Sequence, residues 1–255
     1  MLLVLDIGNT NIVLGVYQDR QLIHHWRIST NKDTTADEYA ATLKNLFSFC
    51  GLEFRSITGA IISSVVPPVT PILEGMIRKY FAMMPMIIGP GIKTGISIVI
   101  DNPRELGADR IVNAVSALTK YGGPLIIVDF GTATTFCAVS ENGAYLGGAI
   151  APGIGISTDA LYQKASKLPR VEIVKTGVII GKNTVSSMQA GIYHGYCGLI
   201  DRIIKLMKKE LGGDPKVVAT GGLAQLVVDD SEMIELIDPF LTLDGLLYIY
   251  EKNTR

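Results

Sequence analysis

Two stretches of this sequence place a carboxylate, a glycine and small polar side chains directly after an apolar run. Residues 6–11 (DIGNTN) follow the apolar residues 2–5, and residues 129–134 (DFGTAT) follow 126–128. Glycine lets the backbone approach a ligand and turn successive N–H groups toward it, which binds phosphate without Lys or Arg. A carboxylate beside phosphate needs a cation in between, and Mg²⁺ is typically held by one or two carboxylates, water and substrate phosphates. Together the stretches indicate a nucleoside triphosphate and Mg²⁺ held between two halves, although each stretch alone is typical of a hairpin turn.

A second reactive set lies in residues 102–110 (NPRELGADR), just before a segment with apolar residues at helical spacing. Asp109 and Arg110 are expected in or near the first turn of that helix. An Asp in this position is often an ordinary cap, and an Arg an ordinary surface residue. As a functional pair, they could bind a carboxylated substrate and orient its hydroxyl. Phosphoryl transfer needs mainly positioning and charge neutralisation, so even a weakly basic carboxylate suffices as the base.

The standard phosphate-binding motifs are not matched elsewhere. Residues 177–184 (GVIIGKNT) resemble a P-loop, but the glycine spacing is one residue short and Asn183 stands where Ser or Thr should follow Lys. Residues 89–94 (GPGIKT) lack the third glycine of a dinucleotide fingerprint. With only His24, His25 and His194 in the chain, a histidine-rich zinc site is also not expected.

The two carboxylate–glycine stretches belong to an internal repeat at about half the chain length. Residues 3–17 and 126–139 both indicate a strand, a tight turn with D-x-G, and a second strand. The rest of the sequence alternates between segments with apolar residues at helical spacing and short apolar segments typical of strands. Helices are expected at 36–50, 72–81 and 190–211, and strands at 60–66, 86–88 and 216–219. We therefore expect an α/β protein of two similar halves, residues 1–115 and 116–255, with largely parallel sheets and ligands at the carboxyl ends of the strands.

Composition limits the remaining functional classes. The chain has 255 residues, 48% hydrophobic and 18% charged, which is typical of a compact globular protein. Its net charge of −1 gives no basic surface for nucleic acid or an anionic membrane, and no apolar stretch is long enough to span a membrane. Three scattered cysteines and the absence of a signal-peptide pattern indicate a reducing, cytoplasmic location.

A set of motifs spread over essentially the whole chain carries a family resemblance. They are DIGNTN at 6–11, SSVVPP at 63–68, NPRELGADRIVNA at 102–114, DFGTATT at 129–135, GGAIAPG at 147–153, GKNT at 181–184 and TGG at 220–222. In this order and spacing they resemble type III pantothenate kinase. The resemblance implies two tandem, duplicated ribonuclease-H-like domains of the actin-like ATPase superfamily. It also implies ATP-dependent phosphorylation of pantothenate to 4′-phosphopantothenate, the first step of coenzyme A biosynthesis.

The resemblance also implies a role for each matching residue. The ATP phosphate loops would comprise Asp6, Ile7, Gly8, Asn9, Thr10, Asn11, Ile12, Val13 and Thr132. Asp109 would be the base for the pantothenate hydroxyl, in a site lined by Gly107, Ala108, Asp109, Arg110 and Thr184. Asp129 would bind a monovalent cation, K⁺ or NH₄⁺, and Mg²⁺ would accompany ATP. The protein would be a homodimer with the pantothenate pocket at the subunit interface, and residues 220–222 would lie near the adenosine.

One departure and two alternative functions accompany this interpretation. Ile100 stands where many family members have a Tyr that packs on pantothenate, so it supplies apolar contact without a hydroxyl. A non-catalytic transcriptional accessory factor on the same scaffold is one alternative, but Asp6, Asp109, Arg110 and Asp129 are all present. Another phosphotransferase of the superfamily, such as a small-sugar or acetate kinase or an exopolyphosphatase, is the second.

Overall fold

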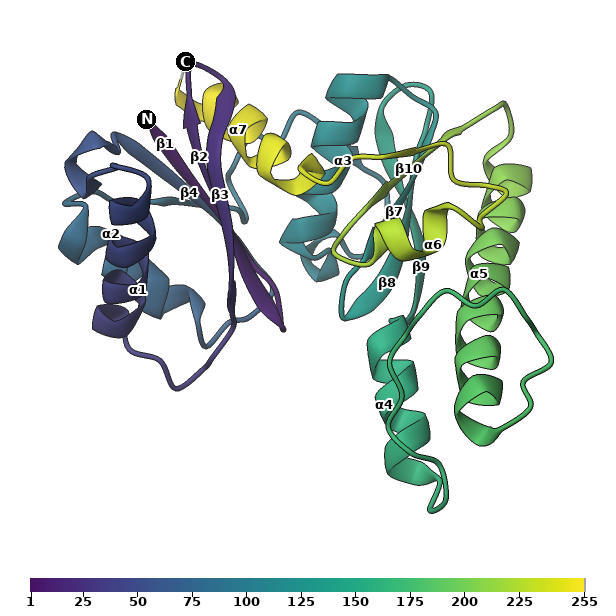
Figure 1. The fold of residues 1–255 in the computed structure, drawn as a ribbon. Coiled ribbons are helices and arrows are strands. Elements are labelled where there is room, and N and C mark those ends of the chain that lie inside the picture. The colour runs from purple at the N-terminus through teal and green to yellow at the C-terminus, as the bar shows by residue number, and fades with distance from the viewer. Residues whose placement is uncertain (255) are drawn as a thin grey trace. The chain divides into compact units, whose positions relative to one another are not determined.

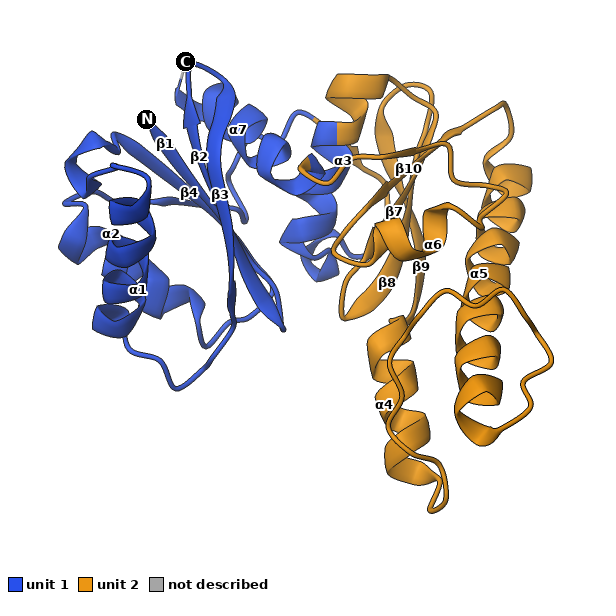
Figure 2. Cartoon of the chain, viewed as in Figure 1, with its two compact units in different colours: residues 1–95, 102–116, 241–255 blue, residues 96–101, 117–240 orange. Residues whose placement is uncertain are grey.

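The computed structural model describes residues 1–254, which form two compact units. The first unit comprises Met1–Gly95, Asn102–Ser116 and the last helix, and the second comprises Ile96–Asp101 and Ala117–Phe240 (Figure 2). The last helix belongs to the first unit because it packs on strands near the N-terminus. The domain division at residues 115 and 116 stays a prediction.

The first unit is built on a five-stranded sheet in the order β3-β2-β1-β4-β5 (Figure 1). The sheet is mixed, because β1 pairs antiparallel with β2 on one side and parallel with β4 on the other. The elements are β1 (Leu2–Ile7), β2 (Asn11–Gln18), β3 (Gln21–Ser29), α1 (Ala36–Phe49), η1 (Phe54–Ser56), β4 (Gly59–Ser64), α2 (Thr70–Tyr80), β5 (Met86–Ile87), η2 (Pro103–Glu105), the first part of α3 (Ala108–Tyr121) and α7 (Leu241–Thr254).

The second unit repeats this arrangement with one added strand. Its six-stranded sheet has the order β11-β10-β7-β8-β9-β6, and β7 pairs antiparallel with β8 and parallel with β10, as β1 does with β2 and β4. Its elements are β6 (Ser97–Ile98), the end of α3, β7 (Leu125–Phe130), β8 (Ala133–Val139), β9 (Ala144–Pro152), α4 (Ile154–Lys164), α5 (Thr184–Leu211), β10 (Lys216–Thr220), α6 (Ala224–Val228) and β11 (Leu236–Ile237). The predicted α/β duplication is therefore confirmed.

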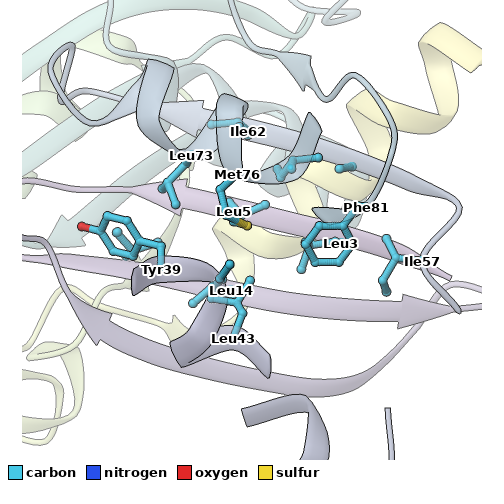
Figure 3. Close-up of a cluster of buried hydrophobic side chains, with 14 of the residues drawn as sticks. Leu3, Leu5, Leu14, Tyr39, Leu43, Ile57, Ile62, Leu73, Met76 and Phe81 are labelled. Atoms are coloured by element: carbon cyan, nitrogen blue, oxygen red, sulfur yellow. The ribbon is translucent and has the colours of Figure 1, made fainter. Parts of the chain in front are cut away.

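One face of the first sheet packs against α1 and α2. Figure 3 shows this core, in which Leu3 and Leu5 of β1 lie with side chains of both helices. Alternate residues of a strand point to opposite faces, so Leu2, Val4 and Asp6 face away from this core. The opposite face is covered by α7. The side chains of Leu243 on α7 and Val4 on β1 both reach the position that a Cβ on Gly15 would occupy. Covering both faces is the usual solution for a sheet with parallel pairing.

The second unit has its own core, formed mainly where α5 packs on the sheet. Tyr193, Tyr196 and Ile200 of α5 are buried with Ile126 and Val128 of β7. Of the predicted elements, the helix expected at 190–211 begins earlier, at Thr184, because Asn183 and Ser186 form a capping box that we did not anticipate. Within the described residues 1–254, no helix is long and apolar enough to cross a membrane.

Candidate active site

The turn between β1 and β2 is closed by one backbone hydrogen bond of its own and by two hydrogen bonds from Thr30. The Gly8 N–H donates to the Asn11 carbonyl at 3.0 Å, and the Thr30 hydroxyl donates to the Gly8 carbonyl at 2.6 Å. Thr30 also donates its N–H to the Thr10 carbonyl at 3.0 Å. Thr30 follows β3 and was not identified from the sequence, since only strand pairing brings it to this turn. The result is a tight, fixed loop with Asn9 and Thr10 exposed at its tip.

Side chains of the predicted ATP loop divide into two groups. Ile7 and Ile12 are fully buried in the core below α1 and α2, so a ligand could meet only their backbone. Asp6 and Val13 lie opposite each other in the β1–β2 register and are half-buried on the other face. The polar loop and the Asp6 carboxylate therefore lie at the carboxyl end of β1, where ligands bind α/β sheets.

Asp109 lies in the first turn of α3 and bends back onto the helix start. Its Oδ1 accepts a hydrogen bond from the Arg110 N–H at 2.7 Å. Burial raises the pKa of the Asp109 carboxyl, and this effect outweighs the hydrogen bond and the Arg110 charge, which lower it. A raised pKa makes the carboxylate a better proton acceptor than an ordinary surface aspartate, while it stays fixed by its backbone hydrogen bond.

The glycine before α3 leaves room for this carboxylate. A Cβ on Gly107 would lie 2.5 Å from Asp109 Oδ1 and 3.5 Å from Val65 Cγ1. Val65 in turn donates its N–H to the Ile7 carbonyl at 3.1 Å. The first unit therefore brings the end of β1, the end of β4 and the start of α3 to one edge of its sheet.

The second unit repeats the turn around Asp129. The Gly131 N–H donates to the Ala133 carbonyl at 3.1 Å, which closes a turn one residue shorter than the Gly8 turn, and Thr132 is exposed. Asp129 is flanked by Thr135 of β8 and Thr220 of β10, as Asp6 is flanked by Val13 and Ser63. The equivalence predicted from the sequence thus extends to the strand register of both carboxylates.

Gly221 lies directly against Asp129 with a φ of +95°, a conformation that favours glycine. A Cβ on Gly221 would lie 2.7 Å from both Asp129 Oδ1 and the Phe130 carbonyl oxygen. Gly221 thus packs directly against Asp129 and the Phe130 backbone, where no side chain fits. The contact of Gly221 with Asp129 was not predicted, because it requires β10 to pair with β7.

Thr184 occupies a separate element of the second unit. It is the first residue of α5 and is exposed, directly after the cap Asn183. Nearby, Gly181 packs so closely below the helix start that a Cβ would collide with Ser187 N. In the second unit the structure therefore places Asp129 and Thr132 on one turn, and Thr184 at the N-terminus of a helix.

Comparisons with known proteins agree with these features. A sequence model of the family described as "Type III pantothenate kinase" matches residues 2–206. A protein of Halalkalibacterium halodurans named type III pantothenate kinase is 59% identical over 253 residues, covering 99% of this chain and 100% of that protein. A protein of a Geobacillus strain with the same name is 60% identical, covering 99% and 98%. Among solved structures, MreB 5 of Spiroplasma citri bound to AMPPNP has a TM-score of 0.55 at 14% identity, covering 99% and 96%, which concerns the fold alone.

Proposed function

The chain belongs to the type III pantothenate kinase family, and from this premise we propose how its residues phosphorylate pantothenate. The reaction is the ATP-dependent phosphorylation of pantothenate to 4′-phosphopantothenate in coenzyme A biosynthesis. Membership favours this reaction over the accessory-factor function and over other phosphotransferase activities. The observation that carries the mechanism is the half-buried Asp109, fixed by the Arg110 N–H and with a raised pKa.

Asp109 acts as the general base in this proposal. Its carboxylate accepts the proton of the pantothenate primary hydroxyl as the oxygen bonds to the γ-phosphorus of ATP, and the bond to the ADP oxygen breaks. General bases contribute typically about 10²–10⁴-fold to rate. Phosphoryl transfer depends mainly on positioning and on charge stabilisation, so the fixed geometry of Asp109 matters as much as its basicity.

Pantothenate carries a carboxylate as well as the reacting hydroxyl. Arg110 follows the base directly and is proposed to bind that carboxylate, since a guanidinium matches a carboxylate with paired donors. Gly107 and Ala108 would line the site beside Asp109, and Thr184 would add a hydroxyl contact. The position of Gly107 against Asp109 supports a shared site for residues 107–110.

The ATP phosphates are proposed to bind the loop from Asp6 to Val13 and the turn at Thr132. Mg²⁺, which ATP-dependent kinases use, would be held mainly by ATP and water with Asp6 as a carboxylate ligand. The donor chemistry fits, because the half-buried Asp6 offers a carboxylate next to the turn between β1 and β2. The ion would neutralise phosphate charge during transfer.

A monovalent cation, K⁺ or NH₄⁺, is proposed at Asp129. The Asp129 carboxylate is a hard oxygen donor of the kind that such cations take, and it lies near the carboxyl end of β7 beside the turn at Gly131. The cation would offset the charge of Asp129 next to phosphate.

A homodimer is proposed from the apolar surface of the second unit. Val178, Ile179 and Ile180, just before α5, are 61%, 62% and 82% exposed, and Ile156 and Tyr162 of α4 are also exposed. Monomeric proteins rarely expose large contiguous apolar patches, and Thr184 lies four residues after Ile180. The pantothenate pocket at the interface would then include Thr184. Changing Ile180 to Asp should shift the solution mass toward a monomer, and an unchanged mass would contradict this part.

The three cysteines support a cytoplasmic location. Among residues 1–254, no disulfide joins Cys50, Cys137 or Cys197. A reducing compartment keeps thiols in this state.

A substrate panel with ADP release as the readout tests the proposed function. With K⁺, Mg²⁺ and ATP present, pantothenate should give ADP and a phosphomonoester, while acetate and small sugars should not. Failure to phosphorylate pantothenate by folded protein would contradict the proposal.

A further inference from the structure

Ser63 of β4 carries a buried hydroxyl that the architecture itself does not use. The residue is 0% exposed, and its Oγ has no hydrogen-bond partner among residues 1–254. Burying a hydroxyl without a partner costs free energy, so such groups in native proteins call for an explanation. The adjacent Ser64 differs, because its Oγ accepts bonds from the Val66 N–H at 3.1 Å and the Thr70 hydroxyl at 2.7 Å. Ser64 thus serves the turn into α2, whereas Ser63 has no such task.

The register of the first sheet places Ser63 beside Asp6. In the parallel pairing of β1 and β4, Asp6 lies opposite Ser63 and Leu5 opposite Ile62. Figure 3 shows Leu5 and Ile62 in the core on the α1 and α2 side, so Asp6 and Ser63 share the opposite face. Neighbouring strands are about 4.8 Å apart, which brings two such side chains within reach of one hydrogen bond.

The same edge also holds the proposed base. Two residues after Ser63, Val65 bonds to the Ile7 carbonyl and lies 3.5 Å from the Cβ position of Gly107, two residues before Asp109. Ser63 therefore lies on the strand that leads into the reactive edge of the first unit.

We propose that Ser63 is a positioning residue for ATP: its hydroxyl donates a hydrogen bond to the Asp6 carboxylate in the nucleotide-bound state. This inference rests on the proposed role of Asp6 in binding ATP with its cation. A serine hydroxyl rotates among three staggered positions, and an ionised carboxylate has about four acceptor sites, so Asp6 can accept this bond along with others. A charge-assisted bond from a buried donor would fix the carboxylate in one orientation toward the ligand.

The test compares three variants with the wild type: Ser63→Ala, Asp6→Asn and the double variant. Binding of ATP with Mg²⁺ is measured by calorimetry in K⁺ buffer without pantothenate, and the melting temperature is measured without ligand. Ser63→Ala should weaken ATP binding by about tenfold or more, the loss of one bond to a charged group. Its melting temperature should stay equal or rise, because the variant removes an unpaired buried hydroxyl. The KM for pantothenate should not change.

Ser116→Ala is the matched control. Ser116 is also fully buried with an unpartnered hydroxyl in the described part of the chain, but it lies about 10 Å along α3 from Asp109. It should bind ATP as the wild type does. Two results together support the proposal. Ser63→Ala loses ATP affinity while Ser116→Ala does not, and adding Ser63→Ala to Asp6→Asn causes no further loss of ATP affinity.

Three results overturn the proposal, and they are distinguishable. Wild-type ATP affinity in Ser63→Ala removes the role of Ser63 alone. Fully additive losses in the double variant show that Ser63 acts independently of Asp6. Wild-type affinity in Asp6→Asn removes the proposed role of Asp6 and this inference with it. If Ser63→Ala does not fold, Ser63→Cys, which keeps the shape but is a weak donor, takes its place, and wild-type affinity there also overturns the proposal.

Discussion

Replacing Gly107 with Ala tests whether the position of Asp109 limits catalysis. The added Cβ would lie 2.5 Å from Asp109 Oδ1, whereas ordinary contact begins at 3.4 Å. The carboxylate oxygen would therefore have to move by about 0.9 Å. A misplacement of about 1 Å in a reacting group can cost 10²-fold in rate. We expect kcat to fall about 10²-fold, which corresponds to about 2.7 kcal/mol of transition-state stabilisation.

The fold should tolerate this change. The atom that must move, Asp109 Oδ1, is the end of a flexible side chain. Weakening its hydrogen bond from the Arg110 N–H lowers the free energy of unfolding by about 1 kcal/mol. The lower conformational entropy of the unfolded chain with Ala in place of Gly partly offsets this loss. Steady-state assays with saturating ATP and pantothenate, together with thermal melting, measure both effects. Gly75→Ala is the matched control, because no atom lies within 4 Å of its Cβ position. A folded Gly107→Ala enzyme with wild-type kcat would refute the reasoning.

Three further predictions concern the carboxylates. Asp6→Asn should leave the melting temperature unchanged and remove ATP-dependent turnover, and wild-type turnover would exclude Asp6 from the ATP site. Replacing K⁺ by Na⁺ should reduce the activity of the wild type, and Asp129→Asn should lose the response to K⁺; equal rates in both salts would contradict the proposed cation. Because burial raises the pKa of Asp109, its stabilising contribution is present at low pH and is lost as the pH rises through that pKa. The melting temperature of Asp109→Asn relative to the wild type should therefore increase from about pH 4 to pH 8, and a constant difference would contradict the burial effect.

The local elements of the fold could be predicted because their signals are short-range. The D-x-G turns after apolar runs indicated both hairpins, and the repeat at half the chain length indicated the duplication, which the two sheets confirm. The helix expected at 190–211 shows the limit: its cap at Asn183 and Ser186 extends the helix back to Thr184. A polar cap gives no hydrophobic periodicity, so the pattern alone placed the start too late.

The supporting contacts of the candidate site could not be predicted, because they depend on which strands pair. Ser63 lies beside Asp6, and Gly221 against Asp129, only through the parallel pairs β1–β4 and β7–β10. The raised pKa of Asp109 likewise follows from its burial in the folded chain. The types of the reactive residues were readable from the motifs, while the groups that position them required the tertiary structure.

The rate of phosphoryl transfer to pantothenate by Asp109→Asn tests the central claim most directly. In single-turnover experiments with ATP, Mg²⁺ and K⁺, an amide at this position keeps the side-chain shape but cannot accept the hydroxyl proton as a carboxylate does. The wild type should form 4′-phosphopantothenate, and Asp109→Asn should do so about 10²–10⁴-fold more slowly with ATP affinity unchanged. Phosphopantothenate formed by folded Asp109→Asn at the wild-type rate would contradict the assignment of Asp109 as the base.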